Sequence, residues 1–210
     1  MYYDELLNAN EFTKNIGLCG RNISPAVARR YLDEPDFFTE LGKYLKFDKP
    51  DELIANCNIV SQLVCEAIND ISGCKAYLTI GDVESGHGST FNMTQSHIVE
   101  VLKMGKKLSI EDYRHHAWIT LDSMEIIDFT YLTSIAFISK DLSNEQRLKY
   151  LGAVISGHAD ELKNGLKFKP ILIGEEFYIE NDEFYVDKKR MYTSLINSKS
   201  GNSHTEFTST

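Results

Sequence analysis

The stretch RHHAWITLDSMEIIDFT, residues 114–130, carries the pattern on which the fold prediction depends. Within residues 117–121, Ala, Ile and Leu at every second position alternate with Trp and Thr, which is the period of a β-strand. An Asp-Ser dipeptide follows at 122–123, and residues 124–129 form a second apolar run. We therefore predict an antiparallel β-hairpin whose turn lies at residues 122–123.

This hairpin would bring His116, at the start of its first strand, close to Asp128, at the end of its second. Asp128 lies among apolar residues, so we expect it to be buried, and a buried carboxylate is costly unless a donor meets it. A carboxylate on one imidazole nitrogen fixes the tautomer and stabilises the cation, which leaves the other nitrogen to accept a proton from a thiol. A purely structural His–Asp pair would explain the same pattern.

Cys57 is the thiol that the sequence places best for such a reaction. Apolar residues recur every three or four positions over residues 53–71, after helix-start residues at 48–50, so we predict a helix from about residue 50 to 72. Cys57 would lie two turns into this helix, on its apolar face, where the helix dipole favours a thiolate. Cys65, two turns deeper, is the competing nucleophile, and a buried structural thiol is the alternative interpretation for either residue.

The remaining pattern predicts an α+β fold. Helix signals dominate residues 1–73 and strand signals are frequent in residues 75–196, so we predict one domain over residues 1–196 with its helical part packed on an antiparallel sheet. Residues 197–210 contain little to bury, which predicts a disordered tail. The predicted elements are helices beginning at Ser24-Pro25 and at Asp33-Glu34-Pro35, a strand over 75–80 closed by Gly81, a loop over 82–93, helices over 95–104 and 143–163, a strand over 170–174 and a hairpin over 176–186.

Composition restricts the classes of function. The chain has 210 residues, 42% of them hydrophobic, and a formal charge of −9, which argues against an extended basic surface for nucleic acid. Neither a membrane-spanning apolar run nor a basic, apolar secretory signal is present, so we expect a cytoplasmic protein, although export without a signal would leave no trace. The four cysteines lack paired or zinc-like spacing, so we expect free thiols and no metal.

Three further residues near these candidates allow specific expectations. His115 should face away from His116 on a regular strand, so the two cannot both bind one metal, and we expect His115 to be a surface or supporting residue. Trp118 shares the face of His116 and would either wall the site or belong to the core. The loop over 82–93 would border the site, with His87 exposed to solvent.

The order of these motifs resembles that of the transglutaminase-like cysteine enzymes, a papain-related superfamily that includes transglutaminases, transglutaminase-like proteases and lasso-peptide leader peptidases. The resemblance covers about residues 50–132. Its matching pieces are Asn56-Cys57-Asn58, the strand from Ala76 to Gly81, the strand from His116 to Leu121, and Ile126-Ile127-Asp128. It implies that Cys57 attacks a carbonyl carbon, that His116 transfers the protons, and that Asp128 orients His116.

The resemblance further implies a thioester intermediate without a cofactor, with the backbone N–H of Cys57 in the oxyanion hole and Asn56, Asn58 or Gln62 as the second donor. We therefore expect a protease, deamidase or transglutaminase acting on a peptide or carboxamide, and the acidic chain favours a basic protein or peptide partner. The alternatives are a non-catalytic interaction protein that keeps the fold and an acyl-CoA-dependent N-acyltransferase with the same triad. The sequence leaves the oligomeric state open.

Overall fold

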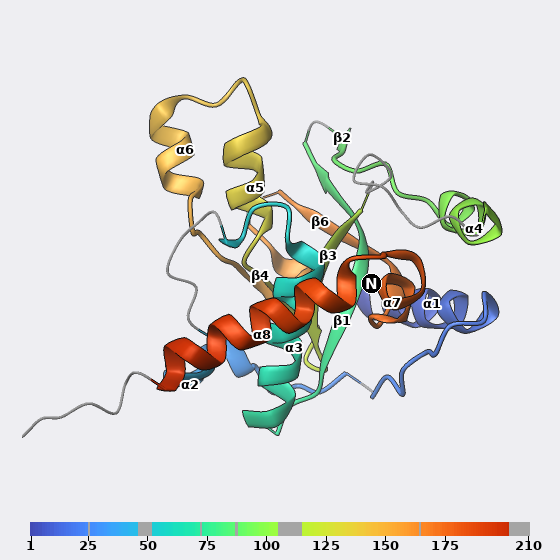
Figure 1. Ribbon diagram of the computed structural model, residues 1–210, viewed down its shortest axis with the longest axis horizontal. Helices are drawn as coiled ribbons and strands as arrows, with labels where there is room; N and C mark the ends of the chain where they lie inside the picture. Colours follow the sequence, from blue (N-terminus) through green and yellow to red (C-terminus); the bar gives the residue numbers. More distant parts are fainter. Residues whose placement is uncertain are drawn as a thin grey trace, which may run out of the picture.

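The computed structural model describes residues 1–24, 26–45, 52–71, 73–86, 88–104, 115–163 and 165–201, and it has the expected α+β character (Figure 1). Among these residues, no helix combines the length and the apolar character needed to cross a membrane. The elements are α1 (Tyr2–Asn15), a 3-10 turn η1 (Tyr31–Asp33), α2 (Phe37–Tyr44), α3 (Cys57–Ile71), β1 (Ala76–Ser85), β2 (Gly88–Ser89), α4 (Gln95–Met104), β3 (His116–Leu121), β4 (Glu125–Asp128), α5 (Tyr131–Ile138), α6 (Asn144–Tyr150), β5 (Ile155–His158), a 3-10 turn η4 (Ala159–Glu161), β6 (Lys167–Ile173), α7 (Glu176–Asn181) and α8 (Tyr185–Gly201).

The strands of the described residues form one antiparallel sheet in the order β2-β1-β3-β4-β5, and β6 pairs with the other edge of β1. The predicted hairpin is confirmed as β3 and β4, in which Ile119 pairs with Ile127 and Thr120 with Ile126. β3 is therefore paired on both of its edges, with β1 and with β4, and it lies in the interior of the sheet.

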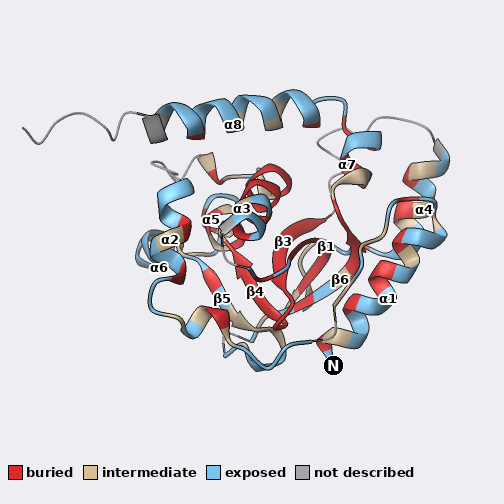
Figure 2. Cartoon of the chain, turned by 90° about the horizontal axis from the view of Figure 1, so that it is seen from below, coloured by how far each residue is buried: buried red, intermediate tan, exposed pale blue. Residues whose placement is uncertain are grey.

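Helices cover both faces of this sheet (Figure 2). Leu78, Ile119 and Ile127 belong to the cluster that packs on α3, together with residues of α2 and α8. On the opposite face, Tyr77 and Trp118 pack with residues of α1. Because side chains alternate between the two faces of a strand, burial of both faces requires each side chain of β3 to be apolar or, like His116 and Thr120, to have a hydrogen-bond partner.

A buried chain of hydroxyl groups fixes α1 against its face of the sheet. The indole N–H of Trp118 donates to the hydroxyl of Tyr2 at 2.9 Å, and that hydroxyl lies 2.8 Å from Thr120 Oγ1. Thr120 Oγ1 in turn lies 2.8 Å from Thr79 Oγ1. Each of these four side chains therefore has a hydrogen-bond partner for its buried polar atom. Trp118 is fully buried and belongs to the core rather than to a cleft wall.

Several predicted boundaries in the helical part were wrong. No helix begins at Ser24, because the described residues around it run irregularly past one end of the paired strands β1 and β3: the Ser24 N–H donates to the Tyr77 hydroxyl and the Val27 N–H to the Asp122 carbonyl. Pro25 lies outside the described residues. α2 begins at Phe37 rather than at residue 33, since residues 31–33 form the separate turn η1.

The later part of the chain also differs from the prediction in places. β1 continues past Gly81 to Ser85, which shortens the expected loop, whereas the helix over 95–104 is confirmed. The capping box at Ser143 is present, but its helix ends at Tyr150 and β5 follows. Residues 176–186 form α7 and the start of α8 instead of a hairpin, and α8 continues to Gly201, into the predicted tail. Residues 202–210 lie outside the described part.

Glycine is required at position 81, where β1 is paired with β3 on one side and with β6 on the other. A Cβ at this position would overlap the Lys169 carbonyl oxygen of β6 and approach the Trp118 ring to 2.9 Å, next to the register shift between Ile80 and Gly81. We predict that Gly81→Ala lowers the free energy of unfolding by about 2 kcal/mol or more, as expected for overpacking against backbone. Urea unfolding monitored by circular dichroism measures the change.

The matched control is Gly42→Ala, because Gly42 is exposed within α2 and a Cβ there meets no atom within 4 Å. That substitution should raise the free energy of unfolding by up to about 1 kcal/mol, since Ala forms helix more readily than Gly. Equal effects at the two glycines would contradict the packing described for Gly81.

Candidate active site

The helix that carries Cys57 begins later than predicted. Cys57 is the first residue of α3 rather than a residue two turns in, and residues 46–51 lie outside the described part of the chain. Ala55, two residues earlier, has a φ of 53°, a conformation that L-residues other than Asn and Asp seldom adopt. This turn ends the preceding segment and starts the helix, so the half-buried Cys57 lies directly at the positive end of the α3 dipole.

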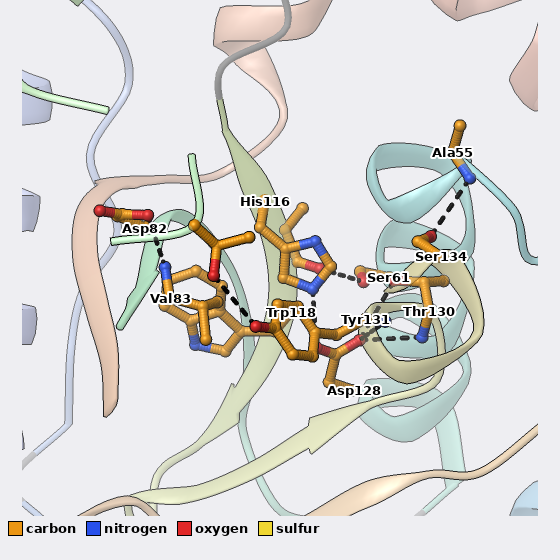
Figure 3. Close-up of polar contacts among 12 residues, drawn as sticks. Ala55, Ser61, Asp82, Val83, His116, Trp118, Asp128, Thr130, Tyr131 and Ser134 are labelled. Carbon is orange, nitrogen blue, oxygen red and sulfur yellow. Dashed lines mark hydrogen bonds and ion pairs between the residues drawn. The ribbon is translucent and has the colours of Figure 1, made fainter. Parts of the chain in front are cut away.

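The turn before Cys57 is braced from two sides. The side-chain N–H of Asn56 donates to the Ile54 carbonyl at 2.9 Å and to the Tyr192 hydroxyl of α8 at 2.8 Å. The Ala55 N–H points to Ser134 Oγ of α5 at 3.4 Å (Figure 3). Helices distant in sequence therefore hold the segment that positions the thiol.

His116 and Asp128 form a fully buried pair. The His116 Nε2 atom lies 2.7 Å from Asp128 Oδ2, and the ring and the carboxylate point at each other in Figure 3. The second oxygen, Oδ1, accepts hydrogen bonds from the Thr130 N–H at 2.9 Å, the Thr130 hydroxyl at 3.1 Å and the Tyr131 N–H at 3.1 Å. The carboxylate is thus fully hydrogen-bonded, as a buried charge must be.

The pKa values of this pair move in opposite directions. Burial alone would lower the pKa of His116, but attraction and hydrogen bonding by Asp128, followed by a hydrogen bond and attraction from the Cys57 side chain, raise it above its usual value. Burial would raise the pKa of Asp128, whereas His116 and the N–H groups of Thr130 and Tyr131 lower it. The pair is therefore an imidazolium and a carboxylate at neutral pH. Because Asp128 occupies Nε2, Nδ1 is the nitrogen left for the thiol.

Aromatic rings hold the imidazole in place. Phe91 stacks on His116 with ring centroids 5.3 Å apart and nearly parallel planes, and Trp118 stacks more loosely at 6.3 Å. Asp82 fixes the loop that carries Phe91, since its Oδ1 accepts from the Phe91 N–H at 2.9 Å. The predicted loop thus borders the site through Phe91, while His87 lies outside the described residues.

Cys57, His116 and Phe91 line one pocket of about 350 Å³. Most of its remaining wall is apolar and comes from the turn before α3 and from α5, and one lysine of α8 completes it. This part of the wall includes Ile54, Ile135, Ile138 and Lys188.

The structure separates the other three cysteines from this arrangement. Cys65 is buried outside the pocket, and burial raises its pKa to about 12, so it is a poor nucleophile. Cys74 is buried and Cys19 is exposed, both outside the pocket. Of the two positions expected for His115, the surface one was wrong: it is buried against Phe177 and Tyr178 and lines the same pocket as His116. Burial, with the neighbouring His116, lowers its pKa to about 3.

Of the three amides considered for the oxyanion hole, Asn58 is the best placed. Gln62 donates to Glu66 at 2.7 Å and does not line the pocket, and the Asn56 amide nitrogen bonds to the turn and to Tyr192. Asn58 lines the pocket, with its Oδ1 accepting from the Ile59 N–H at 2.9 Å. Its amide nitrogen is therefore the side-chain donor that best matches the role.

Among the described residues, no group of three or more His, Cys, Asp or Glu side chains is arranged to hold a metal ion. Sequence reasoning missed Phe91, Tyr131, Ser134 and Lys188, which reach the pocket from a loop and from helices far along the chain. Among these residues, only those of α5 could have been suspected from the sequence. Residues 131–138 are mostly apolar, and a helix that is apolar on most sides must pack against other elements.

In comparisons with known proteins, no family model matches the chain, and no curated protein or solved structure matches it. The resemblance to transglutaminase-like enzymes therefore stays a prediction.

We predict that Asp128→Asn lowers the free energy of unfolding by about 3–5 kcal/mol near pH 5–6, because it leaves His116 buried without its counter-ion. The lowered pKa of Asp128 stabilises the fold above the unfolded value of about 3.9, and this stabilisation is lost as pH falls. The raised pKa of His116 stabilises the fold below about 6.5, and this is lost as pH rises through the folded value. The difference should therefore shrink towards pH 3 and at strongly alkaline pH.

Urea unfolding at a series of pH values tests this dependence. Asp141→Asn, at an exposed position, should change the free energy of unfolding by no more than about 0.5 kcal/mol at any pH. A loss for Asp128→Asn that stays constant from pH 3 to pH 9 would show that the pair is not ionised.

Proposed function

We propose that the protein is a cysteine-dependent acyl-transfer enzyme that attacks a peptide or carboxamide carbonyl and passes through a thioester on Cys57. The observation that carries this proposal is the meeting of Cys57, at the first residue of α3, with the buried His116–Asp128 pair in one pocket. A nucleophile, a base and an orienting acid are the parts that such chemistry requires. The helix-on-sheet arrangement around them supports a papain/transglutaminase-like fold.

In the proposed mechanism, Cys57 gives its proton to His116, and Asp128 stabilises the resulting imidazolium. The sulfur forms a bond to the carbonyl carbon, and the oxygen takes up the negative charge beside the Cys57 N–H and the Asn58 amide. The C–N bond then breaks as His116 gives its proton to the leaving amine or ammonia, and the thioester remains. His116 takes a proton from water or from a second amine, that nucleophile displaces the sulfur, and the acid or the new amide leaves.

The two rival functions predict different chemistry at the same residue. An acyl-CoA-dependent N-acyltransferase would carry an acetyl group on Cys57 after incubation with acetyl-CoA, which intact-protein mass spectrometry detects. A non-catalytic interaction module would show no activation of Cys57. The proposal predicts peptide-derived acyl adducts on Cys57 and none from acetyl-CoA.

We predict that iodoacetamide alkylates Cys57 at pH 6 about tenfold or more faster than it alkylates the exposed Cys19, because an ordinary thiol is only about 0.3% ionised at that pH. His116→Ala should remove this preference, since the imidazolium that stabilises the thiolate is lost. Peptide mapping of alkylated sites over time gives both rates in one sample.

Cys19 serves as the internal reference in every variant, and Cys57→Ser confirms the assignment of the fast site. Where His116→Ala fails to fold, His116→Gln provides a polar replacement of similar length. Equal rates at Cys57 and Cys19 in the folded wild-type protein would refute the proposed function.

A further inference from the structure

The C-terminal helix α8 lies over α3 and is fixed there by polar contacts (Figure 2). The Tyr192 hydroxyl accepts from Asn56, beside the thiol, and donates to the Glu52 carbonyl at 3.1 Å. The Lys189 ammonium bridges Glu66 of α3 at 2.6 Å and Glu175 at 2.8 Å. The segment of α8 that faces the site is therefore held at a defined position.

Lys188 directly precedes these anchors on α8 and lines the pocket of Cys57. Among the described residues that line this pocket, it is the only Lys, Arg, Asp or Glu. Lys189 binds two carboxylates, whereas no ion pair found among the described residues includes Lys188. Lys188 is thus a half-buried cationic residue at the reactive pocket that forms no ion pair with a described carboxylate.

The rest of the pocket wall suits an apolar group. Ile54 comes from the turn before Cys57, and Ile135 and Ile138 come from α5. Ile138 is 63% exposed although it lines the pocket, so a ligand that covered it would remove apolar surface from water. The pocket therefore combines an apolar wall with one cation beside the thiol.

We propose that Lys188 is a specificity-determining residue that binds a carboxylate of the acyl donor, while Ile54, Ile135 and Ile138 hold an apolar side chain next to it. This inference rests on the proposed function and names its substrate class: a peptide with an apolar residue next to a carboxylate. It reverses the expectation of a basic partner, because the charge at the pocket has the opposite sign to the charge of the whole chain.

The first test compares two alkylating reagents of nearly equal size at Cys57. Iodoacetate is an anion and iodoacetamide is neutral, and in both cases the sulfur displaces iodide from the CH₂ group. Lys188→Gln should lower the ratio of the iodoacetate rate to the iodoacetamide rate by about threefold to tenfold, the range expected for one partly solvated charge pair. Lys188→Glu should lower it further. The imidazolium of His116 contributes to the ratio in every variant, so only the change on substitution reports Lys188.

Arg190→Gln is the matched control, since Arg190 lies on the same helix, is exposed, and carries the same charge outside the pocket. Its ratio should equal that of the wild-type protein. A ratio for Lys188→Gln equal to that of Arg190→Gln would overturn the inference and leave the proposed function intact, provided that Cys57 keeps its His116-dependent reactivity. If Cys57 of the wild-type protein does not show this His116-dependent reactivity, the proposed function itself is refuted.

The second test uses dipeptides that protect Cys57 from iodoacetamide. Acetyl-Leu-Glu-amide carries a side-chain carboxylate, acetyl-Leu-Gln carries a terminal carboxylate, and acetyl-Leu-Gln-amide is neutral. The inference predicts that at least one of the two anions protects Cys57 at a concentration at least threefold lower than the neutral peptide, and that Lys188→Gln abolishes this difference. Which anion is better identifies the source of the carboxylate. Equal protection by all three peptides would overturn the inference.

Discussion

The structure of the candidate site depends on the buried ion pair between His116 and Asp128. Two opposite charges removed from water are tolerated only when each has its hydrogen bonds, and Asp128 meets this condition with the imidazole on one oxygen and three donors on the other. Both residues are on adjacent strands in the interior of the sheet, so the pair cannot form unless the hairpin has its observed register. Folding of the hairpin and assembly of the acid–base pair are consequently one event.

Asp128 also connects the pair to the wall of the pocket. Its Oδ1 binds the N–H groups of Thr130 and Tyr131, where α5 begins, so the carboxylate lies at the positive end of that helix. α5 then contributes Ile135 and Ile138 to the pocket, and its Ser134 contacts the turn before Cys57. One carboxylate thus orients the ring and fixes the helix that forms one wall of the pocket.

The sequence predicted those parts of the fold that are coded locally. Alternation over residues 117–121 and the turn at 122–123 were enough to predict the hairpin, and the apolar neighbours of Asp128 were enough to predict its burial. The start of α3 was missed because it depends on Ala55 in a left-handed conformation, for which no Gly or Asn gives a signal. Residues 176–186 have a strand-like composition but form helix, and Tyr178 and Tyr185 there stack on each other at 5.2 Å, a contact that only the tertiary structure provides.

The pocket could not be predicted, since its walls come from segments that the sequence does not connect. Nothing in the sequence around Lys188 sets it apart from the other lysines. Only the position of α8 over α3 places Lys188 at the pocket and Lys189 beside Glu66. Cys57, His116 and Lys188 line one pocket, and His116 is paired with the buried carboxylate of Asp128. Because these side chains are close neighbours, the effects of single substitutions here should not add. Under the proposed function, the reactivity of the thiol and the choice of substrate would therefore depend on the same few side chains.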